Sequence, residues 1–300
     1  KGCDLMNNYV LCGGSTVDLT CEYLKERNIE WIGFHFSIDD KEFVDDMGVN
    51  LSSADFYQAM RDGGETRTWQ LNSEDYCEFF RPFLSDGKDI VYVCLSSGLS
   101  GTYNSACLAA DELAEEFPDR KIYVIDSLGA SSGYGLLVDA LADMRDGGAT
   151  AEELYTAANK MRLNVHHWFF STDLTFYIKG GRVSKTSGMV GNLLGICPLL
   201  NMNTEGKLIP RQKVRTKRKV IAEIVKKMEE HADGGLNYNG KCFVSHSDCA
   251  DDANTVAEMV KERFPNINGE IKIFNIGPTI GCHSGPGTVA LFFFGDERTI

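Results

Sequence analysis

Residues 95–103 gather hydroxyl groups and glycines at the point where a buried strand should end. They read Leu-Ser-Ser-Gly-Leu-Ser-Gly-Thr-Tyr, directly after the apolar run Ile90 to Leu95 and directly before a helical pattern that starts at Tyr103. Free backbone N–H groups at the start of a helix, together with nearby hydroxyls, bind anions well. A serine that only caps the helix is the alternative. A cap alone does not explain five hydroxyl-bearing residues in eight, which favours an anion site around Ser96 and Ser97.

A second glycine-rich segment, residues 277–287, carries one histidine. It reads Gly-Pro-Thr-Ile-Gly-Cys-His-Ser-Gly-Pro-Gly, with four glycines and two prolines in eleven residues. This composition predicts a rigid loop whose backbone, for example at Gly281, can approach a ligand closely. A lone histidine usually belongs to the core, but His283 has no apolar face to fill in such a loop. The imidazole is therefore a candidate for ligand binding.

Two further polar segments contain residues that local structure does not explain. Thr68 lies in the segment Thr66–Ser73, whose last residue is expected to cap the next helix and leaves Thr68 without a structural role. Arg182 follows Gly180 and Gly181, a pair that permits a tight turn. An arginine in this position is either a surface residue or a ligand contact. Thr68 and Arg182 are further candidates for a binding site.

Three familiar catalytic motifs are excluded by their spacing. Residues 180–186 end in Lys-Thr as a phosphate-binding loop does, but Ser184 stands where that loop needs glycine. No Gly-x-Gly-x-x-Gly follows a predicted strand, which argues against a dinucleotide site. His166 and His167 are adjacent and would point to opposite faces of a strand, so they do not form a metal-binding pair. We expect no cofactor and no metal.

The same residues also fit a serine acyl hydrolase. Ser97 or Ser100 lies on a strand-turn-helix, and His283 would act as the base. The local order Gly-Leu-Ser-Gly at residues 98–101 lacks the Gly-x-Ser-x-Gly spacing of a nucleophile elbow. A binding protein without catalysis of its own is favoured, and the hydrolase is the alternative.

The elements that must position these residues alternate between strands and helices in the first half of the chain. Short, almost continuous apolar runs predict strands, and longer runs with helical periodicity predict helices. Strands are expected at Tyr9–Cys12, Trp31–Ile38, Ile90–Leu95 and Ile122–Asp126, and helices at Leu19–Arg27, Ala54–Asp62, Glu74–Leu84, Tyr103–Phe117 and Gly135–Arg145. Apolar strands joined by helices indicate a parallel sheet that is covered on both faces.

The pattern changes after Gly147 and Gly148, where fewer helices separate the strands. A helix is expected at Ala151–Leu163, and strands are expected at His166–Ser171, Pro198–Met202, Lys207–Gln212, Lys241–His246, Ile271–Asn275 and Thr288–Phe294. We predict two α/β domains, residues 1–165 with a parallel sheet and residues 166–300 with a mixed sheet. No low-complexity linker separates them, so they are expected to pack closely with a ligand cleft between them.

The charge of the chain argues against nucleic acid and membrane surfaces as partners. The 300 residues carry a formal net charge of -13, which repels both phosphates and anionic lipids. The exception is the stretch 207–227, where nine lysines or arginines accompany one acid, Glu223. This stretch is either a solvated helix face or a docking patch for an anionic ligand or partner.

The ten cysteines contain no Cys-x-x-Cys pair, which argues against metal clips. Several, such as Cys94 and Cys242, lie in apolar runs and are expected to be free thiols of the core. Free thiols are typical of the reducing cytoplasm. The sequence also shows no export signal and no apolar stretch near the roughly 18 residues that a membrane span needs. We expect a cytoplasmic protein that does not insert stably into a membrane.

Several segments, in their order along the chain, resemble the DegV family of bacterial fatty-acid-binding proteins. The matching segments are Ser15–Leu19, Thr68–Gln70, Ser96–Tyr103, Asp126–Ser127, Lys179–Ser184, Ile196–Leu200, Val214–Thr216 and Gly277–Gly287. The resemblance extends over almost the whole chain from residue 9, and the segments 96–103 and 277–287 are its most distinctive parts.

The resemblance implies two α/β domains around a buried tunnel for one long-chain fatty acid. The residues implied to bind the carboxylate are Thr68, Ser96, Ser97 and His283, and those implied to contact the ligand elsewhere, or a partner, are Gly281, Arg182, Arg215 and Lys217. In family members that serve as fatty acid kinase subunits, the protein presents the acid to a separate ATP-binding subunit, which makes the acyl phosphate. A carrier of another apolar acid, such as a retinoid or a sterol acid, is a third interpretation.

Three positions depart from the family pattern. Gly14 stands where an aspartate is usual, so a carboxylate near the headgroup is missing. Trp69 stands where the family has a small serine and is expected to reshape the pocket. Cys197 replaces the lysine that usually precedes Pro198.

Overall fold

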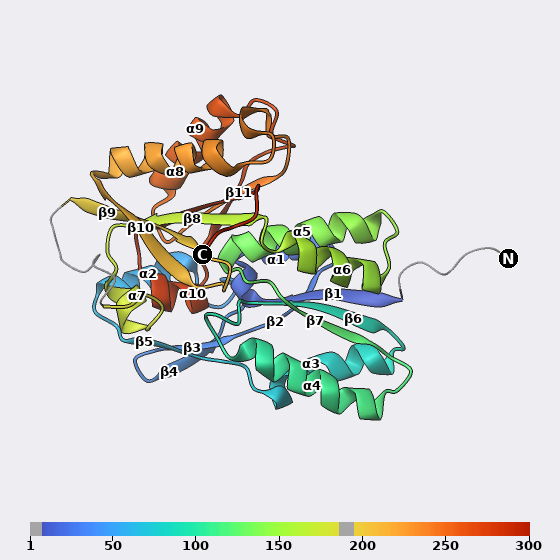
Figure 1. The fold of residues 1–300 in the computed structure, drawn as a ribbon. Helices are drawn as coiled ribbons and strands as arrows, with labels where there is room; N and C mark the ends of the chain where they lie inside the picture. Colours follow the sequence, from blue (N-terminus) through green and yellow to red (C-terminus); the bar gives the residue numbers. More distant parts are fainter. Residues whose placement is uncertain (1–7, 186–194) are drawn as a thin grey trace.

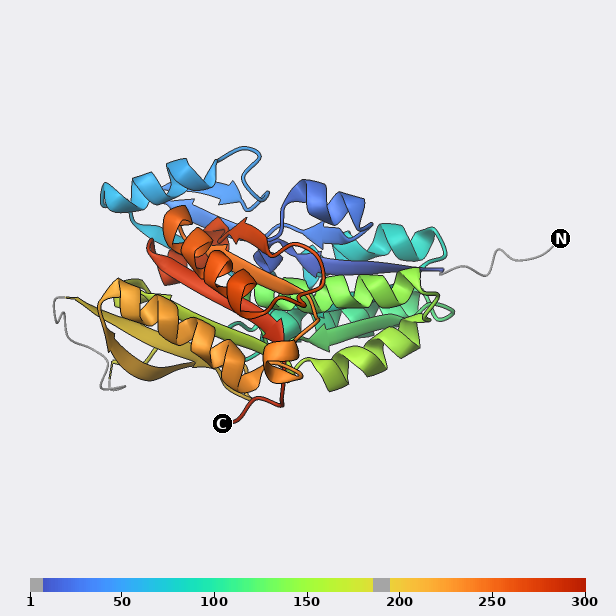
Figure 2. The same ribbon diagram turned by 90° about the horizontal axis from the view of Figure 1, so that it is seen from above.

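Three β-sheets and the helices around them make up the part of the chain that the structure describes, residues 8–185 and 195–300. The structure is a computed structural model. One sheet has four strands, one has three and one has six. Figures 1 and 2 show that the two larger sheets extend side by side through the molecule, with helices on their outer faces.

The four-stranded sheet comes from the first half of the chain and is parallel throughout. Its strands, in spatial order, are β2 (Glu30–Ile32), β1 (Tyr9–Gly14), β6 (Asp89–Cys94) and β7 (Ile122–Asp126). The helices of this half are α1 (Cys21–Glu26), α3 (Ser73–Ser85), α4 (Thr102–Glu116), α5 (Ser131–Asp146) and α6 (Ala151–Met161). Helices α3 and α4 cover one face and α5 and α6 the other (Figure 1), so the predicted parallel sheet is confirmed.

The predicted strand Trp31–Ile38 is wrong as a single element, because the chain changes sheet at Gly33. Strand β2 ends at Ile32, and the next residues enter a separate antiparallel sheet. That sheet consists of β4 (Lys41–Val44), β3 (His35–Ile38) and β5 (Thr66–Trp69), and helix α2 (Ser53–Arg61) follows β4 in the chain. A Cβ atom at Gly33 would lie only 2.5 Å from Val44 Cγ1, so glycine lets β4 fold back closely here.

The six-stranded sheet comes from the second half of the chain and is antiparallel except for one parallel pair, β11 and β12. Its strands, in spatial order, are β10 (Leu208–Arg215), β9 (Ile196–Met202), β8 (Val165–Ser171), β13 (Thr288–Phe294), β11 (Cys242–His246) and β12 (Lys272–Asn275). Helices α8 (Lys217–His231) and α9 (Ala250–Arg263) cover its outer face (Figure 1). The predicted mixed sheet of the second half is confirmed.

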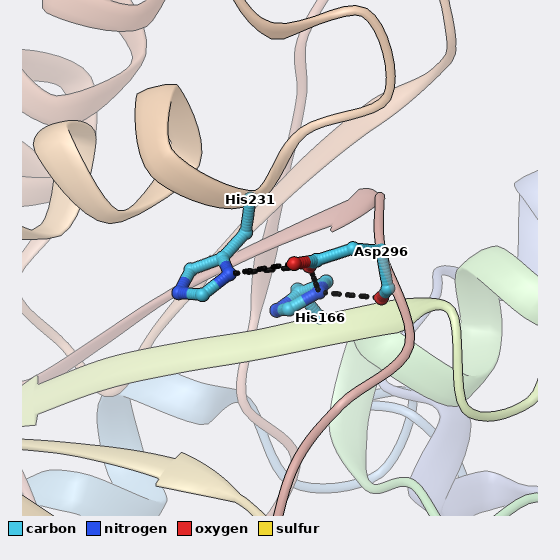
Figure 3. A group of neighbouring side chains, drawn as sticks. All are labelled: His166, His231 and Asp296. Atoms are coloured by element: carbon cyan, nitrogen blue, oxygen red, sulfur yellow. Dashed lines mark hydrogen bonds and ion pairs between the residues drawn. The ribbon is translucent and has the colours of Figure 1, made fainter.

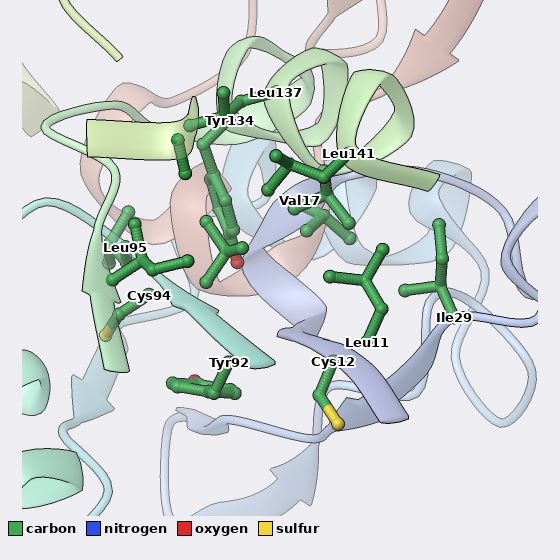
Figure 4. Close-up of a cluster of buried hydrophobic side chains, with 14 of the residues drawn as sticks. Leu11, Cys12, Val17, Ile29, Tyr92, Cys94, Leu95, Tyr134, Leu137 and Leu141 are labelled. Carbon is green, nitrogen blue, oxygen red and sulfur yellow. The ribbon is translucent and has the colours of Figure 1, made fainter. Parts of the chain in front are cut away.

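Helix α5 lies between the two larger sheets and contacts both of them. Two glycines allow this close packing: a Cβ at Gly133 would lie 2.3 Å from the His167 ring, and a Cβ at Gly135 would lie 2.8 Å from the carbonyl oxygen of Val17. Because α5 is buried on both sides, it is not amphipathic as a surface helix is. The largest hydrophobic core, part of which is drawn in Figure 4, therefore includes residues of both halves. The domain boundary near residue 165 stays a prediction.

Two short helices lie in segments that the sequence did not predict to be helical. They are α7 (Thr175–Lys179) and α10 (Pro278–Ser284), and the second occupies most of the segment predicted as a rigid loop. Helix α10 starts with a proline, which suits the first helical turn, and it ends at Gly285, whose φ of 66° favours glycine. None of the helices in the described residues is both long and apolar enough to cross a membrane.

Candidate functional site

A cavity of about 390 Å³ lies between the two larger sheets, next to β5 and α10. Pockets of about 300–1,000 Å³ are typical of small-molecule sites. The cavity adjoins the end of β6, which lies beside β1, where the strand order of the parallel sheet reverses. Ligands of open α/β sheets bind at the carboxyl ends of the strands at this point.

The wall of the cavity is mostly apolar and comes from both halves of the chain. Its large apolar residues are Phe34, Trp69, Leu95, Leu99, Phe169, Tyr177, Met202, Leu208, Ile276, Ile280 and Phe292. The described residues of the lining include one cation, Arg182, and no aspartate or glutamate. The cavity thus combines an apolar wall with a positive charge that has no acidic neighbour in the lining.

Thr68, His283 and Arg182 form a chain of polar contacts at this cavity. Thr68 is on β5 and His283 is on α10, and Thr68 Oγ1 lies 2.8 Å from His283 Nε2. The other ring nitrogen, Nδ1, lies 3.4 Å from Arg182 Nη1. Arg182 also donates to the carbonyl oxygens of Gly180, at 2.5 Å, and of Leu99, at 3.1 Å. Three residues that are far apart in the sequence are therefore brought together.

These contacts determine which atoms of Thr68, His283 and Arg182 carry the protons. A guanidinium group only donates, so His283 Nδ1 must accept from Arg182. The proton of the neutral ring is then on Nε2, which donates to Thr68 Oγ1. The threonine hydroxyl accepts this bond, so its own proton is free to be donated to a group in the cavity. Thr68 and Arg182 both offer donors, which suits an anionic ligand.

Burial and the neighbouring guanidinium keep His283 neutral. Burial, and then the positive charge of Arg182, lower the pKa of the imidazole to about 4. Burial also lowers the pKa of the Arg182 guanidinium from its usual value. A partly buried guanidinium whose protein partners are carbonyl oxygens and an imidazole is stabilised when an anion binds beside it.

Two buried carboxyl groups hold the start of α10 and so position His283. Asp18 Oδ1 accepts from the backbone N–H of Gly277 at 2.9 Å, and Asp45 Oδ2 accepts from the backbone and the hydroxyl of Thr279 at 3.2 and 2.6 Å. Acceptors at the first turn of a helix satisfy N–H groups that have no partner within the helix. Burial raises the pKa of both carboxyl groups.

Gly281 does not line the cavity, although it lies on the same helix as His283. A Cβ at this position would lie 2.7 Å from the ring of Phe56 and 2.7 Å from Tyr57 Oη. The glycine therefore allows α10 to pack against α2, and the expected contact of Gly281 with the ligand or a partner stays a prediction.

Ser96 and Ser97 have partners in the protein and do not line the cavity. Ser96 is buried, and its hydroxyl donates to the carbonyl oxygen of Gly206 at 2.8 Å. Ser97 donates to Asp126 Oδ2 at 2.5 Å, and its backbone N–H donates to the other oxygen of that carboxylate at 3.1 Å. Ser100 and Gly101, a few residues further on, line the cavity instead. The turn was identified from sequence, but which of its hydroxyls faces the ligand depends on tertiary contacts.

The geometry does not form a serine hydrolase triad. The lone pair of His283 faces Arg182, and its N–H faces Thr68. The Ser97 hydroxyl is bonded to Asp126. Within the described residues, neither Ser97 nor Ser100 is hydrogen-bonded to His283, and a base that is adjacent to an arginine is a weak one.

Arg215 and Lys217 lie outside the cavity. Arg215 is exposed at the end of β10, and Lys217 opens α8 and forms an ion pair with Asp252 at 2.9 Å. The hydrogen bond to Asp252 raises the pKa of Lys217. In the described part of the chain, no acid within 4.0 Å pairs with four exposed cations of this surface, Lys213, Arg215, Arg218 and Lys219. We call these four residues the basic surface.

The three departures from the family pattern have different surroundings. A Cβ at Gly14 would lie 2.7 Å from the Phe34 ring, so the absence of a side chain here leaves room for an aromatic ring of the cavity wall. Trp69 lines the cavity and is 40% exposed, which places it at an opening of the cavity. Cys197 is buried in β9 and does not line the cavity.

Sequence reasoning missed His167, Gln70 and Thr288 as lining residues. His166 and His167 do point to opposite faces of β8, and His167 lines the cavity. Gln70 belongs to the segment 68–70 that resembles the family, so this resemblance could have identified it as a lining residue. Thr288 Oγ1 is hydrogen-bonded to Tyr177 Oη at 2.9 Å. This contact joins distant segments, so no local sequence pattern predicts it.

Comparisons with known proteins agree on one family. The family model described as an uncharacterised protein of the DegV family matches residues 13–296. A DegV domain-containing protein of Clostridium perfringens is 35% identical over 294 residues, which cover 98% of this chain and 99% of the relative.

Solved structures agree with this result. A Thermotoga maritima protein, described as revealing a fatty acid binding function, has a TM-score of 0.83 at 26% identity, with 96% of this chain and 99% of that chain covered. The Streptococcus pneumoniae Fatty Acid Kinase (Fak) B3 protein, loaded with linoleic acid, has a TM-score of 0.82 with coverage of 96% and 99%. At 24% identity, this second likeness concerns the fold.

Proposed function

The chain belongs to the DegV family, and from that premise we propose that it binds one long-chain fatty acid in the cavity between its sheets. The observation that carries the proposal is the contact chain Thr68–His283–Arg182 in a cavity whose described lining holds no acid. The carboxylate is bound by the Thr68 hydroxyl and the Arg182 guanidinium, with Ser100 nearby. His283 holds these two donors apart and supplies no charge of its own.

The apolar wall supplies most of the affinity. Burying one methylene contributes about 0.8 kcal/mol, so a chain of about 15 methylenes contributes on the order of 10 kcal/mol before ordering costs are subtracted. The headgroup contacts contribute less and select the acid over a neutral lipid. A retinoid or sterol acid has the same headgroup, so the shape of the wall decides between these ligands.

Extraction of the purified protein tests this proposal. The chain is expressed in a bacterial host, purified, denatured and extracted, and the acids in the extract are measured by mass spectrometry against protein concentration. We expect about one long-chain fatty acid per chain, and none from Arg182→Glu prepared in the same way. Folded wild-type protein without any acyl lipid contradicts the proposal. A retinoid or sterol acid in place of a fatty acid would support the third interpretation.

We further propose that the chain presents the acid to a separate ATP-binding fatty acid kinase subunit. The family resemblance suggests this role, and the S. pneumoniae protein of the same fold is named as a fatty acid kinase protein. The basic surface at the end of β10 and the start of α8 suits contact with an acidic partner or with ATP phosphates. The carrier then has no catalysis of its own. A cytoplasmic location, where free thiols persist and ATP is present, is part of the proposal.

A coupled assay tests the presentation role. Acyl phosphate is measured with the chain alone, with a cognate kinase alone and with both, in the presence of ATP and Mg²⁺. We expect product only with both. Product formed by the chain alone contradicts the carrier role, and no product with both proteins contradicts the presentation role while leaving fatty acid binding untouched.

A further inference from the structure

Three side chains from distant parts of the second half meet at the outer face of the six-stranded sheet. His166 lies on β8, His231 is the last residue of α8, and Asp296 follows β13. Figure 3 shows both imidazoles directed at Asp296, and the centroids of the two rings are 4.8 Å apart. One ligand atom from each residue lies within 4.8 Å of the other two. None of the three lines the fatty acid cavity.

The two rings point their nitrogens at the same carboxylate oxygen. His166 Nε2 lies 2.9 Å from Asp296 Oδ1, and His231 Nδ1 lies 3.1 Å from it. Ligands of a tetrahedral zinc ion, with bonds of about 2.0–2.1 Å, lie about 3.3 Å from one another. An ion therefore fits between the two nitrogens once the carboxylate of Asp296, whose side chain is 62% exposed, moves back to become the third ligand.

The main chain holds this arrangement rigidly. The backbone N–H of Asp296 donates to the carbonyl oxygen of His231 at 3.0 Å, and that of Asp233 donates to Phe294 at 3.1 Å. Ala232 and Gly295 form a β-bridge between them. The His166 ring is also packed parallel to the ring of Phe293, with centroids 5.1 Å apart. A site whose ligands are held in place before the ion arrives loses less entropy on binding.

The donor types and their burial suit a divalent transition metal. Two imidazoles and one carboxylate are a common ligand set for zinc and related ions. The His166 side chain is 4% exposed, and its Nε2 also lies 2.9 Å from the backbone carbonyl oxygen of Asp296, so the ring must carry its proton on Nδ1 when an ion binds at Nε2. The His231 side chain is 31% exposed, which leaves a solvent side for entry and for a water ligand.

We propose that His166, His231 and Asp296 bind a divalent transition metal ion of the zinc type, which ties the C-terminal segment to α8 and β8. The expectation of no metal rested on motif spacing, and these ligands are too far apart in the sequence to form a motif. The role is structural, since no pocket of the fatty acid site adjoins the three residues. The inference is independent of fatty acid binding.

Zinc titration of the chelator-stripped protein is the first test. We expect one Zn²⁺ per chain by isothermal titration calorimetry, with a dissociation constant in the micromolar range or tighter. Asp296→Asn and His231→Gln replace the ligands by polar side chains that can still form a hydrogen bond, so both variants should fold. They should weaken Zn²⁺ binding by at least about 10–100-fold, because even substitutions outside the ligand set reduce metal affinity by that factor. His35→Gln, a histidine of β3 outside the cluster, is the matched control and should bind as the wild type does.

Co²⁺ in place of Zn²⁺ gives a second readout that a purely hydrogen-bonded cluster would not produce. The Trp168 ring lies 5.7 Å from the His231 ring, so bound Co²⁺ should quench its fluorescence in the wild type and in Trp69→Phe, and quench much less in Trp168→Phe. Absence of Zn²⁺ binding, or binding that Asp296→Asn and His231→Gln leave unchanged, would overturn the proposal. A thiolate-to-cobalt absorption band would overturn it as well, because the ion would then be on a cysteine.

Discussion

The two histidine clusters of this protein differ in the sign of the charged group that contacts the imidazoles. His283 lies between a hydroxyl and a guanidinium, whereas His166 and His231 both contact one carboxylate. The first cluster has a positive charge without an acid in the described cavity lining, and the second has a negative charge in reach of two imidazoles. The difference indicates opposite ligands, an anion in the cavity and a cation at the outer face of the sheet.

Reversing the charge of the first cluster should have the largest effect. Arg182→Glu places a carboxylate beside the bound carboxylate, and like charges in a site that excludes water cost several kcal/mol. We expect a loss of fatty acid affinity of about a thousandfold, measured by displacement of a fluorescent fatty acid. Arg182→Gln, which removes the charge without reversing it, should lose less. Equal affinities for all three proteins would mean that the anion does not lie at Arg182.

Acid should destabilise the first cluster in a defined pH window. His283 has a pKa of about 4 in the folded chain, below the value of about 6.5 in an unfolded one, so the unfolded state binds the proton first as the pH falls. The contribution of His283 to the free energy of unfolding is complete above pH of about 6.5 and falls by about 1.4 kcal/mol per unit down to pH of about 4. Chemical denaturation of the wild type and of His283→Gln should show a difference that shrinks over this window. A difference that does not depend on pH would contradict a neutral buried His283.

Removing single neutral donors should have a smaller effect. Thr68→Val and His283→Ala should each weaken fatty acid binding by about 1–3 kcal/mol, because each leaves polar groups of the headgroup site without a partner. Ser97→Ala is the matched control. The Ser97 hydroxyl is bonded to Asp126 outside the cavity, so its loss should leave affinity within about 0.5 kcal/mol of the wild type. A loss of affinity in Ser97→Ala as large as that in Thr68→Val would indicate that the carboxylate binds at the Ser96–Ser97 turn.

Changes on the basic surface should leave fatty acid affinity unchanged and act on the coupled reaction alone. Arg215→Glu and Lys213→Glu should slow acyl phosphate formation with the kinase by a few fold, and the wild-type rate should fall as salt rises, because exposed charges are screened beyond about 10 Å at 0.1 M. Lys121→Glu, an exposed charge reversal in the first half of the chain, serves as the control. Normal coupling by both basic-surface variants would place the partner elsewhere.

Sequence could predict the parallel sheet because its strands are buried on both faces and read as continuous apolar runs. It could not predict the break at Gly33, since the contact that requires glycine comes from Val44, a residue of another strand. Helix α10 was hidden for a related reason. Its glycines and prolines are typical of a loop, and the acceptors that hold its first turn, Asp18 and Asp45, come from segments far away in the chain.

The same limit applies to the two clusters. Thr68, Arg182 and His283 were found as candidates because each lies in a polar segment that local structure does not explain. Their contact with one another, and the absence of Ser96 and Ser97 from the cavity, depend on how β5, α10 and the Ser96–Ser97 turn pack together. The outer cluster gave no signal at all, because His166, His231 and Asp296 belong to three elements and share no motif.

Helix α5 has a consequence for how a ligand leaves. Because it packs against both larger sheets, swinging the two halves apart would expose buried residues on one face of this helix. Exposing buried apolar surface costs about 25 cal/mol per Å², so such a hinge motion carries a high barrier. We therefore expect a ligand of the cavity to exchange through local movements near Trp69, which lines the cavity and is 40% exposed, and to have a long residence time.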